Sequence, residues 1–158
     1  MNEVVSRVIN LAFRLTPGDQ ARLRRGARDD ELLLIPGLGA LLAPLAPSGQ
    51  LGRDGGRLLR TARLAAVLRE PGPDHPAAAL SKAGYAERRM SRLLATDDAD
   101  VLFGRLLIAA RFLAAKRVRC RVRPFDRLLA ERPDATCAPE RAAWALQFAE
   151  NPEKQKRR

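Results

Sequence analysis

The chain has 158 residues, 46% of them hydrophobic, which is enough for one domain or two small ones with a buried core. Twenty-nine Lys and Arg residues oppose eighteen Asp and Glu, giving a formal net charge of +11. With only two cysteines, the composition excludes a disulfide scaffold, and the charge favours an anionic partner.

The apolar residues are chiefly Leu and Ala, which favours helices over a large sheet. We predict an all-α fold of two small helical bundles, over residues 1–70 and 77–150, joined by a Pro/Gly-rich loop and followed by a basic tail at 151–158. We find no long uninterrupted apolar span, and the amino terminus does not resemble a signal peptide. We therefore expect a cytoplasmic protein without membrane contacts.

The amino-terminal half predicts several helices in succession. Apolar residues at helical spacing indicate a first helix over 3–15. Thr16 as N-cap and Pro17 as first helical residue predict a second helix that ends near Gly26. The apolar segment 31–45 predicts one or two short helices because Pro and Gly interrupt it. Residues 46–56 are expected to form a flexible link before a longer helix over 57–70.

The carboxy-terminal half begins after the sequence PGPDHP at 71–76, which predicts a loop. Helices are expected over 85–95 and, in the core, over 101–115, with Thr96, Asp97 and Asp98 at the second helix's amino terminus. An extended connector, a short helix over 125–131 and a last helix over 139–148 complete the prediction.

The connector has arginine at every second position in KRVRCRVRPFDRLL, residues 116–129. This period is that of an extended chain, in which alternate side chains face opposite sides. The arginines Arg117, Arg119, Arg121 and Arg123 would then face water, while Val118, Cys120 and Val122 face the core. The segment is either an ordinary connector between helices or an anion-binding row.

The chain offers no convergent set of catalytic residues. His75, its only histidine, is expected to face solvent in the predicted loop. Helix capping explains the acidic residues at 97–100 better than a metal site does. Cys120 and Cys137 have no evident base partner and are expected to be buried structural thiols. We predict a non-enzyme with no metal and no cofactor.

Two aromatic residues near the carboxyl end, Trp144 and Phe148, lie four positions apart. This spacing is more typical of core anchors than of platforms on which bases stack.

Arginine is therefore the most informative residue type, and it occurs in groups. Besides the connector row, the groups are Arg22, Arg24, Arg25 and Arg28; Arg53, Arg57, Arg60 and Arg63; and Arg88, Arg89 and Arg92. Each group alone could be a solvated face, but four groups on one chain favour contacts with phosphate, which the planar guanidinium binds bidentately. Such contacts supply affinity without reading base sequence.

Three stretches, in the right order, resemble the small subunit of the type I-E CRISPR Cascade complex, the CasB family. They are DQARLRRGARDDELLLIPGLGALL, YAERRMSRLLATDDADVLFGRLLIAARFLAAKRVRCRVRPFDRLLAE and PERAAWALQFAE. The last is similar to the family's closing R-x-x-W-A-x-x-F/Y pattern through Arg141, Trp144, Ala145 and Phe148. Together the stretches cover over half of the chain.

The resemblance implies a non-catalytic, all-helical subunit that holds crRNA and target DNA, including the displaced strand of the R-loop. It implies the backbone and large Cascade subunits and a second copy of the chain as partners. Residues matching the family's basic positions are implied as contacts: Arg22, Arg24, Arg25, Arg88, Arg89, Arg92, Arg105, Arg111 and Arg141. The region 44–56 and the strongly basic connector depart from the family's pattern.

Two alternatives stay open at this point. One is a free-standing, DNA-binding or transcription-associated helical protein, although the few Asn and Gln residues do not group on a convincing recognition helix. The other is a scaffold whose arginines meet acidic protein surfaces.

Overall fold

The computed structural model describes residues 1–26, 28–132 and 138–150. Within these ranges every regular element is helical apart from one isolated β-bridge, which confirms the predicted all-α fold. The α-helices are α1 (Asn2–Arg14), α2 (Pro17–Arg25), α3 (Asp29–Leu32), α4 (Leu38–Leu42), α5 (Arg53–Leu68), α6 (Pro76–Lys82), α7 (Glu87–Leu94), α8 (Ala99–Ala115), α9 (Arg123–Ala130) and α10 (Pro139–Ala149), and a 3-10 helix, η1 (Ala43–Leu45), follows α4. The predicted tail, 151–158, and Cys137 lie outside the described residues.

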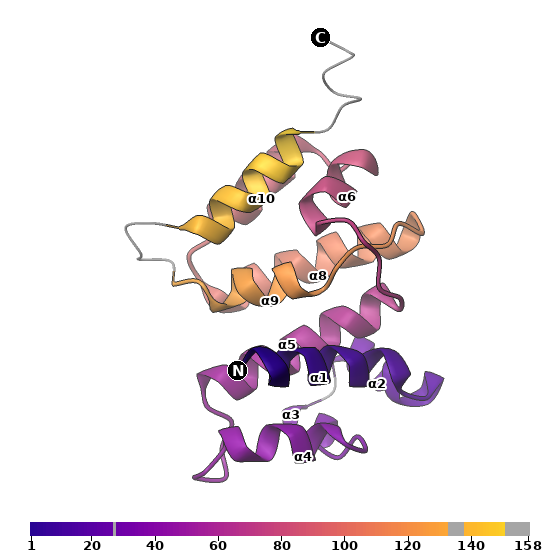
Figure 1. The fold of residues 1–158 in the computed structure, drawn as a ribbon, viewed down its shortest axis with the longest axis vertical. Helices are drawn as coiled ribbons and strands as arrows, with labels where there is room; N and C mark the ends of the chain where they lie inside the picture. The colour runs from indigo at the N-terminus through magenta and orange to yellow at the C-terminus, as the bar shows by residue number, and fades with distance from the viewer. Residues whose placement is uncertain (27, 133–137, 151–158) are drawn as a thin grey trace.

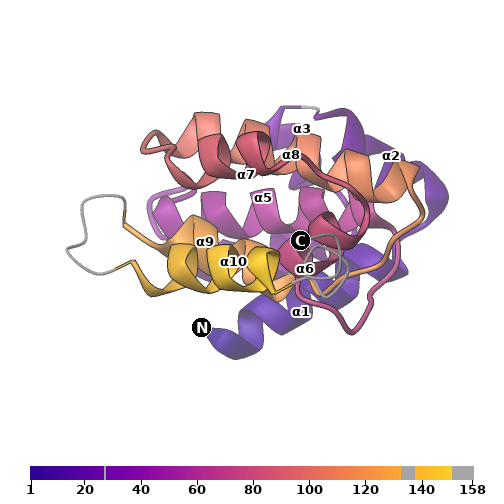
Figure 2. The ribbon, with the colours of Figure 1, turned by 90° about the horizontal axis from the view of Figure 1, so that it is seen from above.

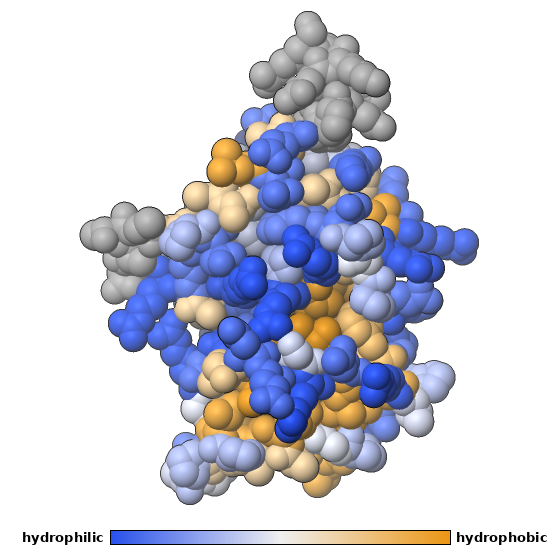
Figure 3. Space-filling model, in the orientation of Figure 1, coloured by the Kyte–Doolittle hydropathy of each residue, from blue (hydrophilic) through white to orange (hydrophobic). Residues whose placement is uncertain are grey.

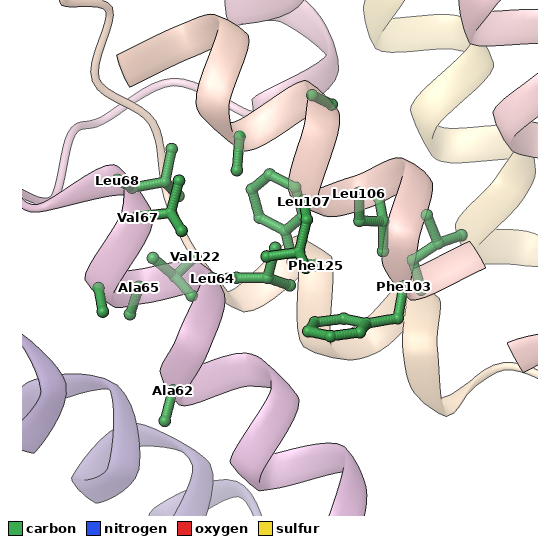
Figure 4. Packing of buried hydrophobic residues seen from close by; sticks show 14 of the residues in the cluster. Ala62, Leu64, Ala65, Val67, Leu68, Phe103, Leu106, Leu107, Val122 and Phe125 are labelled. Carbon is green, nitrogen blue, oxygen red and sulfur yellow. The ribbon is translucent and has the colours of Figure 1, made fainter. Parts of the chain in front are cut away.

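Helix α5 is the central element of the fold. It lies between α1 to α4 on one side and α6 to α10 on the other (Figure 1), and it packs against α1, α2, α8 and α9. Viewed from above, α8 lies beneath α7 and α9 beneath α10, and α5, which packs against both α8 and α9, runs between these pairs (Figure 2). In Figure 4, Leu64 of α5 points toward Leu107 of α8 and Phe125 of α9. One hydrophobic cluster thus extends across the predicted boundary between the bundles.

The start of α5 corrects the expected flexible link. Residues 53–56 are helical, although their two glycines indicated a flexible chain. Gly55 is buried, and a Cβ at this position would lie 2.8 Å from the Leu51 side chain. The glycine therefore permits close packing rather than flexibility.

Helix α6 was missing from the sequence prediction. Its first residue is Pro76, and the Nδ1 atom of His75 accepts a hydrogen bond from the Ala77 N–H at 3.1 Å. A proline tolerates the first helical position because its missing N–H would have no helical partner there. Pro76 therefore begins a helix instead of ending the loop.

His75 itself does not face solvent as expected. Its ring is partly buried and packs edge-on against Trp144, with ring centroids 5.4 Å apart. Trp144 is fully buried and Phe148 is 5% exposed, so both are core anchors as predicted.

The predicted extended connector is shorter than expected. Helix α8 ends at Ala115, and Arg117 adopts a left-handed conformation with φ of 56°. Arg123 is the first residue of α9 rather than the end of an extended row. Between them, Cys120 and Val122 are buried and Val118 is half-buried, while Arg119 and Arg121 are exposed, so the predicted alternation holds over this part.

The connector runs alongside the loop after α5. Pro71 and Cys120 form a parallel bridge, the Gly72 N–H donates to the Cys120 carbonyl at 3.0 Å, and the Arg121 N–H donates to the Asp74 carbonyl at 2.8 Å. A Cβ on Gly72 would lie 2.5 Å from the Arg119 Cβ, so the two segments approach closely only because residue 72 is glycine. This pairing brings the carboxyl ends of α5 and α8 together.

Candidate nucleic-acid interface

The structure separates the predicted arginines into those with partners inside the fold and those exposed to solvent. Arg57 belongs to the first kind, since its side chain is only 12% exposed and pairs with Asp54 and Asp126. Its Nε donates to Asp126 Oδ1 at 3.1 Å, and the same oxygen accepts from Thr61 Oγ1 at 2.9 Å. Arg57 therefore joins α5 to α9.

Arg141 is enclosed in a similar way, with a side chain 13% exposed. It donates to the carbonyl of Leu94 and, at 2.8 Å, to that of Thr96, and its Nε lies 3.6 Å from Glu131 Oε1. These contacts attach α10 to the turn between α7 and α8.

Two further predicted arginines are bonded inside the chain. Arg105 donates to the Arg92 carbonyl at 2.7 Å and to Thr96 Oγ1. Arg123 donates to Ser6 Oγ at 2.7 Å and to the Asn2 carbonyl at 3.0 Å, which connects α9 to α1.

The predicted group on α5, Arg53, Arg57, Arg60 and Arg63, lines one cleft of about 410 Å³ together with Phe103. Arg60 and Arg63 each lie over the Phe103 ring, 5.1 Å from its centroid. Arg60 pairs with Asp100, and Arg63 Nε donates to the Leu23 carbonyl at 3.1 Å. Burial lowers the pKa of Arg63. The exposed Arg53 also lines the cleft, as do the acidic residues Asp29, Asp97 and Glu131.

The groups on α2 and α7 lie mostly at the surface. On α2, Arg22 is 3.5 Å from Asp19, Arg25 donates to the Ala21 carbonyl, and Arg24 is half-buried. Beyond it, the exposed Arg28 pairs with Asp30 at 3.0 Å.

On α7, Arg88 and Arg92 are exposed, and neither guanidinium has an ion pair or hydrogen bond within the described chain. Arg89 lies 6.0 Å from the centroid of the Tyr85 ring. Arg111 of α8 is also exposed.

A further group of exposed basic side chains lies where the carboxyl ends of α5 and α8 meet. We call it the connector patch and define it by Arg69, Lys116, Arg117, Arg119 and Arg121, which are all exposed. In Figure 3, hydrophilic side chains project from the upper right-hand side of the molecule, with hydrophobic residues beside and below them. Across the ranges that the structure describes, the patch has one ion pair, Arg119 to Glu70 at 2.8 Å, so its net charge is strongly positive.

Beside the patch, a surface hollow of about 450 Å³ lies between the two helix ends. Arg69, Arg117, Arg119 and Glu70 supply its charged groups, and Leu68, Ala114, Ala115 and Val118 supply its apolar walls. Arg69 was missed by sequence reasoning because it reaches the connector row only through the pairing of Pro71 with Cys120. Its basic side chain at a helix end was the available signal.

Two titratable side chains, His75 and Cys120, have pKa values far from their ordinary ones. Burial, together with the charges of Arg121 and Arg127, lowers the pKa of His75 to about 4, so the ring is neutral at pH 7. Burial raises the pKa of the Cys120 thiol to about 12, which keeps it protonated, as a structural thiol would be.

The acidic residues before α8 act at the helix end. Asp98 Oδ1 accepts a hydrogen bond from the Val101 N–H at 2.9 Å, as helix capping predicts. Across residues 1–26, 28–132 and 138–150, no group of three His, Cys, Asp or Glu side chains is arranged to hold a metal ion. In the same ranges no helix has the length and apolar character needed to span a membrane.

No family model, curated protein or solved structure matches this chain.

Proposed function

We propose that this chain is a non-catalytic nucleic-acid-binding protein that holds phosphate backbones on the connector patch. The observation that carries the proposal is the gathering of five exposed cationic side chains with one carboxylate partner, Glu70, in the described part of the chain. Like charges gathered in one patch repel one another, and phosphate groups relieve that repulsion, while the cations of the patch replace counterions condensed on the nucleic acid.

The chemistry of the patch favours backbone contacts over base reading. Four of its five cations are arginines, whose planar donors fit phosphate oxygens bidentately. The patch lies on a connector and two helix ends, so it presents no recognition helix to a major groove. We therefore expect binding that depends on salt and hardly on sequence.

The biological setting that we propose is a Cascade complex, with this chain as its small subunit. The support is the resemblance of the three stretches and the agreement between an all-α fold and what the resemblance implies. In this setting the chain contacts crRNA and target DNA, including the displaced strand, beside the backbone and large subunits and a second copy of itself. The exposed Arg88, Arg92 and Arg111 are further contacts in this proposal.

The experiment compares two triple variants with equal loss of charge. Arg117→Ala/Arg119→Ala/Arg121→Ala empties most of the connector patch. The control, Arg7→Ala/Arg14→Ala/Arg127→Ala, removes three exposed arginines of α1 and α9. Binding of unrelated single-stranded and duplex oligonucleotides is measured by fluorescence anisotropy between about 50 and 200 mM salt.

We expect the patch variant to lose affinity, while the control keeps the wild-type slope of log affinity against log salt concentration. The slope of the patch variant should flatten by up to about 2 to 3 if each arginine meets its own phosphate, and by less where two of them share one. Equal slopes for all three proteins would contradict the proposed interface. Strong preference for one sequence would favour the free-standing DNA-binding alternative, and salt-independent failure to bind any oligonucleotide would favour an acidic protein partner.

The Cascade setting is tested by co-expressing the tagged chain with Cascade subunits and crRNA from its own genome. Purification of the chain without these subunits would contradict that setting.

A further inference from the structure

Two arginines of the hollow have an unusual backbone conformation. Among the described residues, Arg69 (φ of 69°) and Arg117 (φ of 56°) are the only ones other than glycine with positive φ. L-residues with a Cβ are disfavoured in this region, and arginine is not among the types that enter it readily. Both residues line the same hollow between α5 and α8.

Each arginine ends its helix through local backbone hydrogen bonds. The Arg69 N–H donates to the Ala65 carbonyl at 2.9 Å, and the Glu70 N–H donates to the Leu68 carbonyl at 2.8 Å. The second bond closes a three-residue turn around Arg69, a type that is rare and strained when its central φ is positive.

At the end of α8, the Val118 N–H donates to the Leu113 carbonyl at 3.0 Å and the Arg117 N–H donates to the Ala114 carbonyl at 3.1 Å. This pattern places residue 117 where helices commonly have glycine.

The backbone of these turns does not require arginine side chains. Glycine would form both turns with less strain. Cations near a helix carboxyl end are favoured by the helix dipole, but a cation in the last helical turn would serve that purpose without a left-handed residue. In the described ranges neither guanidinium donates to a carbonyl or pairs with a carboxylate, and both side chains are exposed. The two strained residues thus carry guanidinium groups that make no stabilising contact within the described part of the chain.

We propose that Arg69 and Arg117, beside the ion pair of Arg119 with Glu70, form a site for one phosphodiester group of a bound nucleic acid. This inference rests on the proposed function and assigns its central contact. Glu70 neutralises Arg119, which leaves two unpaired guanidiniums at one hollow to meet one phosphate. Leu68, Ala114 and Val118 give the hollow apolar walls, and charge-assisted hydrogen bonds are stronger beside apolar surroundings than in open water. Strained residues that the surrounding structure holds in place are characteristic of functional sites.

The test is a variant in which stability and binding move in opposite directions. Arg69→Gly/Arg117→Gly relieves two left-handed conformations, and we expect the melting temperature to rise by about 4 °C. We expect its affinity for a single-stranded oligonucleotide to fall about tenfold at 100 mM salt, and the salt slope to flatten by about 0.7, the value for one lost phosphate contact. A lower melting temperature would overturn the premise of strain.

Two matched variants test whether the position of the charges matters and whether the guanidinium donors matter beyond their charge. Arg7→Gln/Arg127→Gln removes the same charge outside the hollow and should leave the salt slope and affinity within twofold of wild type. Arg69→Lys/Arg117→Lys keeps the charge without the bidentate donors, and we expect it to retain the salt slope while losing part of the affinity.

The source of the phosphate is examined by titrating inorganic phosphate into wild type and the glycine variant. Saturable binding confined to wild type, without any difference in oligonucleotide affinity, would assign the hollow to free phosphate and overturn the proposal. If wild type binds no oligonucleotide at all, the proposed function fails. If wild type binds and the glycine variant binds equally well with an unchanged slope, only the hollow fails.

Discussion

Asp126 of α9 accepts a hydrogen bond from Arg57 of α5 although the two residues are 69 positions apart in the chain. Both side chains are nearly buried, at 7% and 12% exposure, and Asp126 also accepts from Thr61. A charged pair in such surroundings is stable only while both partners remain, because a single buried charge is strongly disfavoured.

Asp126→Ala should therefore destabilise the fold by about 3 kcal/mol, since it leaves Arg57 with the more exposed Asp54 as its ionic partner. Chemical denaturation measures the change. The double variant Arg57→Met/Asp126→Leu replaces the pair by apolar side chains and should recover most of the loss. Oligonucleotide affinity should remain at the wild-type value in all folded variants, and a selective loss of affinity would place Arg57 in the interface instead.

Arg141→Ala should loosen the docking of α10 rather than reduce nucleic-acid binding. The substitution leaves the carbonyls of Leu94 and Thr96 without their donor, and leaves Glu131, whose side chain is 6% exposed, without its cation. We expect a loss of about 2 to 3 kcal/mol. Hydrogen exchange should accelerate in α10 but not in α1. Unchanged exchange together with weaker oligonucleotide binding would contradict this assignment.

Gly72→Ala should separate the loop after α5 from the connector. An added Cβ would meet backbone atoms of Arg119 and Cys120 at 2.7 and 2.8 Å, and backbone can yield only by moving. We expect a destabilisation of about 2 kcal/mol and reduced oligonucleotide affinity as the patch is displaced. Gly104→Ala is the control, because nothing lies within 4 Å of its Cβ position in α8 and the change should stabilise by about 0.5 to 1 kcal/mol.

His75 should make stability depend on pH below neutrality. Its pKa in the folded chain is about 4, below the ordinary value of 6.5, so the unfolded chain binds the proton more readily. The stability from His75 is therefore complete above pH 6.5 and is lost as the pH falls toward 4. Full conversion of the shift gives about 3 kcal/mol, and solvent screening of a partly exposed ring reduces our expectation to about 2 kcal/mol.

His75→Asn keeps a side chain that can cap α6 but does not titrate. Thermal denaturation between pH 7.5 and 5 should show a falling melting temperature for wild type and a nearly constant one for this variant. Because His75 is the only histidine, parallel pH profiles for the two proteins would exclude it as the cause.

The sequence was sufficient for elements whose signals are local. The Thr16–Pro17 start of α2 and the Asp98 cap of α8 are confirmed because capping acts within three residues. Helix α6 was missed because Pro76 occurs equally well in a loop and at a first helical position. The early start of α5 was missed because packing against Leu51, which makes Gly55 suitable, is not a local signal.

The candidate site was less predictable than the fold for a related reason. A sequence shows where charges occur but not which charges find partners, and Arg57 finds Asp126 only after the chain folds. Arg69 joins the connector row through the bridge between Pro71 and Cys120, which no periodicity indicates. The alternation of the row was informative only where the chain is extended, and it ended where α9 begins at Arg123.

Arg121, in the extended part of that row, and Arg123, in α9, should therefore respond differently to substitution. Arg123 donates to Ser6 Oγ and to the Asn2 carbonyl, so Arg123→Ala should destabilise the contact of α9 with α1 by about 1 to 2 kcal/mol. Arg121 is exposed, so Arg121→Ala should change stability by less than about 0.5 kcal/mol. The effect on nucleic-acid binding should be the larger for Arg121. Its loss should flatten the salt slope by about 0.7 to 0.9, and loss of Arg123 should leave the slope unchanged. Denaturation and anisotropy on the same two variants measure both effects. If Arg123→Ala flattens the slope as much as Arg121→Ala, both arginines meet phosphate and the row acts as one unit despite the start of α9.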